Sequence, residues 1–143
     1  MTHTRPMPPR PAPAPSDPPR ADLATRLPLF ALVVIPYAWL AHRFDFVCDD
    51  AYISFRYARN FAEGLGLRYN AVEAPPVEGY SEFLWVVWCA FFEWIGVDVT
   101  VAARVTSVLF GIATLWWVMR FAERRFGLSP ERAALPAAFL ALF

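Results

Sequence analysis

The chain has 143 residues, 57% of them hydrophobic and 17% aromatic, and its 13 arginines balance 13 acidic residues to a formal net charge of zero. A chain without a basic excess gives no electrostatic reason to bind nucleic acid. The hydrophobic share exceeds the roughly 45–50% of an ordinary soluble domain, and it lies almost entirely in residues 27–143. This distribution favours a membrane protein over a soluble globular one.

Residues 1–26 have a composition unlike the rest of the chain. They hold eight of the fourteen prolines, with alanine, arginine and aspartate between them. Such a segment cannot form a helix or bury a core, so we expect a disordered, extended tail. Its arginines place this tail in the cytoplasm under the positive-inside rule.

Four apolar runs follow the tail. The sequence predicts membrane spans at about 27–46, 82–97 and 101–121, and the start of a fourth at 133–143. Crossing ~30 Å of hydrocarbon takes about 20 residues, so the run 82–97 is short and has to thin the bilayer or use flanking residues. The predicted fold class is therefore all-α, a polytopic membrane helix bundle. Because the last run is apolar to its end, we expect the chain to be an N-terminal fragment of a longer protein.

The predicted spans conflict with the charges at one turn. Three crossings from a cytoplasmic tail place residues 120–132 outside, although this segment carries four arginines. The positive-inside rule disfavours that arrangement. Either the run 82–97 does not fully cross, or this turn is an exception.

The polar loop 47–81 carries the chemistry of the chain. It opens on two adjacent carboxylates, Asp49 and Asp50, and a helix is expected over 50–63, ended by Gly64. Asp49 suits a helix N-cap, and carboxylates in a first turn suit the helix dipole. This helix is amphipathic and is expected to lie along the membrane surface.

Helical phasing of about 100° per residue gathers a polar stripe on that helix. Asp49, Arg56, Asn60 and Glu63 fall on the stripe, and Tyr52 and Arg59 flank it. An ordinary surface pair between Arg59 and Glu63 explains part of it. The two adjacent carboxylates at the membrane edge remain unexplained by a generic interfacial helix.

Two segments of the loop resemble a known family. DDAYISFRYARNFAEGLGLRYN, followed by VEGYSEFLW at the start of the second run, resembles polytopic bacterial glycosyltransferases of the GT-C superfamily, and most closely the cell-wall arabinofuranosyltransferase type. The resemblance covers about residues 46–85 closely. It extends more loosely through 96–127, a pattern also seen in protein-mannosyltransferase-like relatives.

The resemblance implies an inverting glycosyltransferase of the cell membrane. Such an enzyme moves a sugar from a polyprenyl-phosphate donor to a glycan, lipid or protein acceptor on the outer face, which puts loop 47–81 outside. An aspartate of the first outer loop acts as base in that family. Asp49 and Asp50 both match it, and the sequence does not distinguish between them.

The remaining candidate site residues follow from the same chemistry. An arginine stabilises charge on a leaving phosphate, and Arg56 is the candidate for this contact. Glu78 and Tyr80 are candidates for hydrogen bonds to a sugar, with Tyr52 and Asn60 as further substrate-binding residues.

A divalent cation is the one cofactor that these residues suggest. Some GT-C enzymes hold a metal with acidic residues of this loop. Asp49, Asp50 and Glu78 offer the oxygen ligands that Mg, Mn or Ca prefer.

Two other functions compete with transfer. A truncated, non-catalytic membrane protein or partner subunit is favoured by the apolar run that ends the chain. A transporter fragment would need broken helices, for which Pro36 is the one hint. We expect residues 1–143 alone to be inactive, since most spans of the family's members would be missing.

Overall fold

The computed structural model describes residues 22–72, 75 and 77–142. Within them the chain forms helices and no strands, which confirms the predicted all-α class. The tail prediction for residues 1–21 lies outside the described residues. The helices are α1 (Leu23–Arg43), α2 (Asp49–Ala62), α3 (Phe83–Trp94), α4 (Val99–Phe126) and α5 (Pro130–Leu142).

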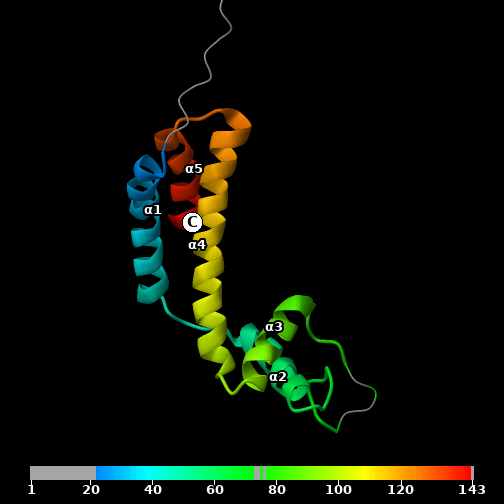
Figure 1. The fold of residues 1–143 in the computed structure, drawn as a ribbon. Coiled ribbons are helices and arrows are strands. Elements are labelled where there is room, and N and C mark those ends of the chain that lie inside the picture. The colour runs from blue at the N-terminus through cyan, green and yellow to red at the C-terminus, as the bar shows by residue number, and fades with distance from the viewer. Residues whose placement is uncertain (1–21, 73–74, 76, 143) are drawn as a thin grey trace, which may run out of the picture.

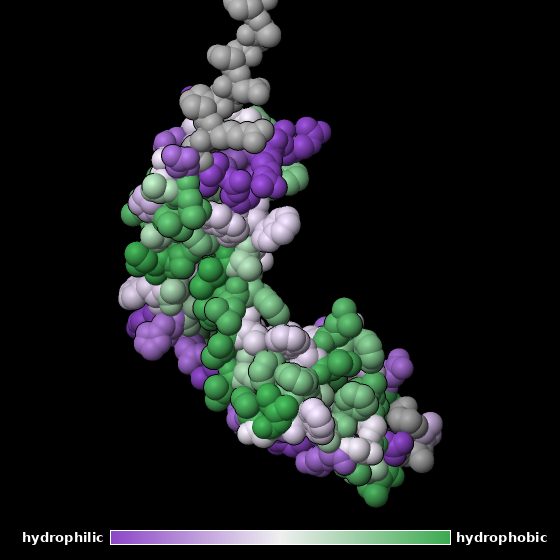
Figure 2. All heavy atoms as spheres, viewed as in Figure 1, coloured by the Kyte–Doolittle hydropathy of each residue, from purple (hydrophilic) through white to green (hydrophobic). Residues whose placement is uncertain are grey.

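The helices form two lobes that share α4. Figure 1 shows α1 and α5 beside one end of α4, and α2 and α3 gathered at its other end. Figure 2 shows the largest hydrophilic patch at one end of the α1/α4/α5 lobe, smaller hydrophilic patches elsewhere, and hydrophobic residues over the middle of that lobe. The molecule is therefore polar at this end and apolar along the flank of its long helices.

The helix α1 begins earlier than expected. It starts at Leu23 and ends at Arg43, so residues 23–26, assigned to the disordered tail, are helical. The helix continues through Pro28 and Pro36.

The helix α4 has clear signals at both ends. The Asp98 carboxylate accepts hydrogen bonds from the backbone N–H groups of Thr100 (2.9 Å) and Val101 (3.2 Å), as a helix N-cap does. Gly127 ends the helix with a φ of 63°, a left-handed conformation that glycine adopts without strain. The 28 residues between these signals rise about 42 Å.

Two of the described helices, α1 and α4, are long and apolar enough to cross a membrane, by length and composition. The helix α3 is apolar but has only 12 residues, which rise about 18 Å and fall short of the ~30 Å hydrocarbon layer. Of the three complete spans predicted from the sequence, two thus have a helix of spanning length.

Each lobe has its own apolar core. In the α2/α3 lobe, Tyr57, Ala58, Val86 and Cys89 are the most buried side chains, joined by Val99 from the start of α4. In the other lobe the buried residues come from α1, α4 and α5 and are Val33, Leu115, Met119, Ala122, Ala133 and Ala137. The small alanines let α5 approach α4 closely, since small side chains permit close contact between helices.

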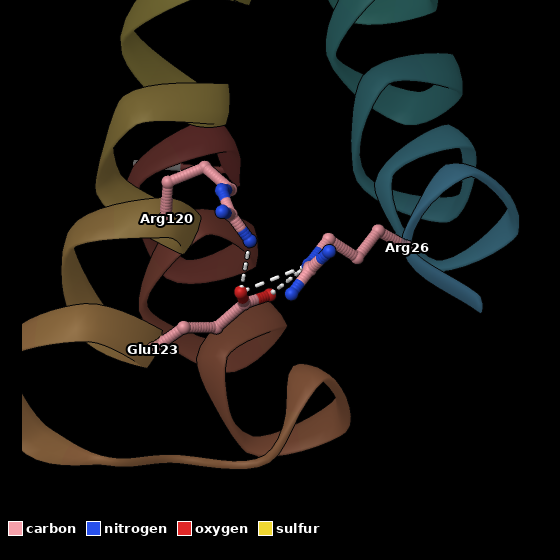
Figure 3. Close-up of polar contacts among 3 residues, drawn as sticks. All are labelled: Arg26, Arg120 and Glu123. Atoms are coloured by element: carbon pink, nitrogen blue, oxygen red, sulfur yellow. Dashed lines mark hydrogen bonds and ion pairs between the residues drawn. The ribbon is translucent and has the colours of Figure 1, made fainter. Parts of the chain in front are cut away.

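Charged side chains also join α4 to α1 and to the segment that follows α1. At the hydrophilic end, Arg26 donates from Nε to both oxygens of Glu123 (3.1 and 2.9 Å), and Arg120 pairs with the same carboxylate (Figure 3). At the opposite end, Arg104 pairs with Asp45 at 2.9 Å. The first cluster is largely buried, whereas the second is about half exposed.

Candidate functional site

The acidic pair lies in the first turn of α2. Cys48 is the N-cap of this helix, so the expectation that Asp49 caps it is wrong; Asp49 and Asp50 are its first two residues. Both side chains are exposed, and neither has a hydrogen-bond or ion-pair partner among the described residues. Two carboxylates in a first turn are stabilised by the helix dipole, and both are accessible to an incoming group.

Arg56 and Asn60 hold the loop that follows α2. Arg56 donates from Nε to the Tyr69 carbonyl (2.9 Å), and its guanidinium lies 5.1 Å from the centre of the Tyr69 ring. Asn60 donates from Nδ2 to the carbonyls of Arg68 (2.7 Å) and Tyr69 (2.9 Å). Asn60 is buried, unlike Asp49 and Arg56. The predicted polar stripe is thus divided, because its Asn60 position faces the protein.

Tyr57 holds the end of the loop that leads into α3, a role that the sequence analysis did not predict. Its hydroxyl donates to the Val77 carbonyl (2.6 Å), and its ring packs edge-on against Tyr80 with centroids 4.8 Å apart. Gly79 passes so close that a Cβ there would lie 3.0 Å from the Tyr57 hydroxyl. A buried tyrosine needs a polar partner for its hydroxyl, which was the available signal that Tyr57 organises a loop.

A hydrogen bond also joins the middle of α2 to the start of α3. The Ser54 hydroxyl donates to the Glu82 carboxylate, which also accepts from the backbone N–H (3.1 Å) and the hydroxyl (2.9 Å) of Ser81. The Ser54 bond, followed by the Ser81 side-chain bond, lowers the pKa of Glu82 below its ordinary value of 4.5. Glu82 occupies the N-cap position of α3, without a side-chain cap bond.

Arg59 pairs across the lobe rather than along its own helix. Its guanidinium lies 3.1 Å from Glu93 on α3, instead of pairing with Glu63 as expected. Glu93 also accepts from the Val99 backbone N–H at 3.4 Å. The Glu93 carboxylate therefore ties α2 and α3 to the start of α4.

The other candidate residues lie around this lobe. Tyr52 is half exposed and packs edge-on against Phe55 at 5.6 Å, and Tyr80 is partly buried against Tyr57. Glu78 is exposed. Across the described part of the chain, no three His, Cys, Asp or Glu side chains gather in a group that could hold a metal ion. Asp49, Asp50 and Glu78 thus do not fit the predicted cation site in this arrangement.

The structure therefore brings Tyr57, Tyr80, Arg56 and Asn60 together around the loop 68–80, and leaves the two aspartates exposed at the start of α2. This lobe has accessible carboxylates, aromatic side chains, and Arg56, which makes its hydrogen bond through Nε and not through its terminal nitrogens. Compared with models of known protein families, with curated proteins and with solved structures, the chain matches none.

Proposed function

We propose that this chain is part of a GT-C-type membrane glycosyltransferase, which transfers a sugar from a polyprenyl-phosphate donor to a glycan, lipid or protein acceptor. Asp49 or Asp50 is the base in this proposal. The observation that carries it is the pair of adjacent, exposed carboxylates in the first turn of α2, which have no ion-pair partner among the described residues. The resemblance of residues 46–85 to that superfamily names the reaction.

The proposed orientation follows from the helix lengths and the charges. With α1 and α4 as the crossing helices and α3 too short to cross, the start of α1 and the end of α4 lie on one side of the membrane. The Arg26–Glu123–Arg120 cluster joins those two ends directly. The positive-inside rule then assigns the arginine-rich end to the cytoplasm. The conflict at residues 120–132 disappears, and α2 faces outward as the mechanism needs.

The chemistry matches what these side chains can do. An acceptor sugar hydroxyl is a weak nucleophile until a base removes its proton in the transition state, and an exposed carboxylate performs that step. The leaving phosphate needs charge stabilisation more than protonation. Arg56 donates to the Tyr69 carbonyl through Nε alone. Its two terminal nitrogens are therefore the proposed hydrogen-bond donors to that phosphate.

The proposal includes no step through a metal, since the candidate ligands do not gather. It also assigns Asn60 and Tyr80 to shaping the loop rather than to contacting the sugar. Because both aspartates lie on an open surface, residues 1–143 by themselves are expected to lack transfer activity. The test therefore belongs in membranes of cells that express the complete product of the gene.

In such membranes, transfer from a synthetic polyprenyl-phosphoryl arabinofuranose is measured for Asp49→Asn and Asp50→Asn. Removing a general base lowers the rate by roughly 10²–10⁴-fold, and we expect this loss in one of the two variants. Asp45→Asn is the matched control, a carboxylate of the same region that pairs with Arg104. Full activity in both variants would overturn the assignment, and would favour a non-catalytic partner subunit.

A further inference from the structure

One face of α4 carries an apolar groove whose lining residues, apart from Val118, belong to neither core. The groove has a volume of about 530 Å³ and is lined by Phe110, Ala113, Thr114, Trp117, Val118 and Phe121. The Thr114 hydroxyl donates back to the Phe110 carbonyl (2.8 Å), so it offers no unpaired donor to the groove. The surface is thus suited to a hydrocarbon chain.

The groove leads to two exposed arginines. At about 100° per residue, Arg124 and Arg125 continue the same stripe of α4, one on each side of it. Both are exposed, and neither takes part in an ion pair among the described residues. Glu123, which follows Phe121 by two positions, is already shared by Arg26 and Arg120. This end of α4 therefore has cationic side chains without carboxylate partners.

The dimensions match one leaflet of a bilayer. From Phe110 to Phe121 the helix rises about 16 Å, close to half of the ~30 Å hydrocarbon layer. Arg124 and Arg125 follow at the depth of the headgroups, where arginine pairs bidentately with phosphate. The apolar groove and the two arginines at its end are together complementary to a lipid with an anionic headgroup.

We propose that this face of α4 binds an anionic glycerophospholipid, with its phosphate on Arg124 and Arg125 and one acyl chain in the groove from Phe121 to Phe110. The site lies at the end of α4 opposite to Asp49 and Asp50. It is therefore distinct from the proposed transfer site and does not depend on glycosyltransferase activity.

The test measures lipid retention by native mass spectrometry of the full chain in detergent. Phosphatidylglycerol, phosphatidylcholine with the same acyl chains, and polyprenyl phosphate are added in turn. We expect phosphatidylglycerol to bind most strongly. Arg124→Gln combined with Arg125→Gln should weaken its binding by about tenfold or more, since each arginine near a headgroup contributes to anionic-lipid binding. Arg43→Gln is the matched control and should leave phosphatidylglycerol binding unchanged, because Arg43 is the last residue of α1 and lies far from Arg124 and Arg125.

A second pair of variants tests the groove. Ala113→Phe fills the groove and should weaken the binding of both phospholipids. Val105→Phe, at an exposed position outside the groove, should leave their binding unchanged. Equal binding of phosphatidylglycerol and phosphatidylcholine would overturn the proposal, as would unchanged binding in the double arginine variant. Preference for polyprenyl phosphate would instead identify a prenyl-lipid site. A dimer that Ala113→Phe dissociates would instead identify a second copy in the groove.

Discussion

The hydroxyl of Tyr37 on α1 lies directly against Gly111 on α4, in the space that any larger residue at position 111 would need for its Cβ. Glycine at this position lets the two long helices approach closely, as small residues do between membrane helices. Tyr37 also packs against the core of the α1/α4/α5 lobe, so the contact limits the distance between α1 and α4 beside that core.

Gly111→Ala is therefore expected to destabilise the α1/α4/α5 lobe. Overpacking of this kind costs about 1–3 kcal/mol, measured as a lower thermal-unfolding midpoint in detergent. Thr114→Ala, an exposed position on the same helix, is the control and should change little. If Tyr37→Ala fails to relieve the effect of Gly111→Ala in a double variant, the contact is not the cause.

Tyr57→Phe should loosen the loop that leads into α3. The change removes the hydrogen bond to the Val77 carbonyl, worth about 1 kcal/mol, and keeps the ring packing on Tyr80. Limited proteolysis should then cut residues 77–82 faster. Tyr52→Phe, whose side chain is half exposed, is the comparison that should leave the cleavage rate unchanged.

The stability of the α2/α3 lobe is expected to depend on pH through the ionisation of Glu82. The hydrogen bonds from Ser54 and Ser81 lower its pKa below 4.5 in the folded chain, so folding favours its ionised form. This contribution is fully present above pH 4.5 and is lost as the pH falls through the lowered pKa. The difference in unfolding free energy between the wild type and Glu82→Gln should therefore shrink in acid. In Ser54→Ala the Glu82 pKa should lie nearer its ordinary value, and an unchanged titration would contradict this origin.

Glu123→Gln should destabilise the arginine-rich end strongly. Its side chain is only 8% exposed and the Arg26 side chain 15%, and removing one partner of a buried ion pair costs about 3 kcal/mol or more. Asp45→Asn breaks the pair with Arg104, in which both side chains are 45% exposed, and should cost less than about 1 kcal/mol. If chemical denaturation shows equal losses of unfolding free energy in the two variants, burial does not determine how much each ion pair contributes.

The native cysteines test the proposed topology. Cys48 is exposed at the start of α2, whereas Cys89 is buried. A membrane-impermeant maleimide should label Cys48 in intact cells. Arg125→Cys in a Cys48→Ser background should react only after permeabilisation. Labelling of Cys48 only from the cytoplasmic side would reverse the orientation and remove the outward-facing site.

The helices were largely predictable because hydropathy and helix-ending residues act locally. Gly64 ends α2 in a left-handed conformation (φ 80°), as its position after residues 50–63 suggested. The long apolar runs became α1 and α4. For the run at 82–97, hydropathy alone did not show that Glu82 and Ile95 flank a helix of only 12 residues.

The partners of the polar side chains were not predictable, because they come from other elements. Helical phasing put Asn60 on an exposed stripe, but the loop carbonyls of Arg68 and Tyr69 cover it. Arg59 had a carboxylate one turn away in its own helix, and it pairs instead with Glu93 of α3. Phasing describes one helix, whereas these contacts depend on how the chain folds back over it.

The two cores lie toward opposite ends of a single helix, α4. In α4, Thr106 and Leu115 are buried, and no position from 107 to 114 is. Local opening of one lobe therefore exposes little of the other, and the two should behave as separate cooperative units. A substitution that unfolds α2 and α3 would leave the arginine-rich lobe folded, so loss of the proposed chemistry and loss of the proposed membrane insertion would be separable defects.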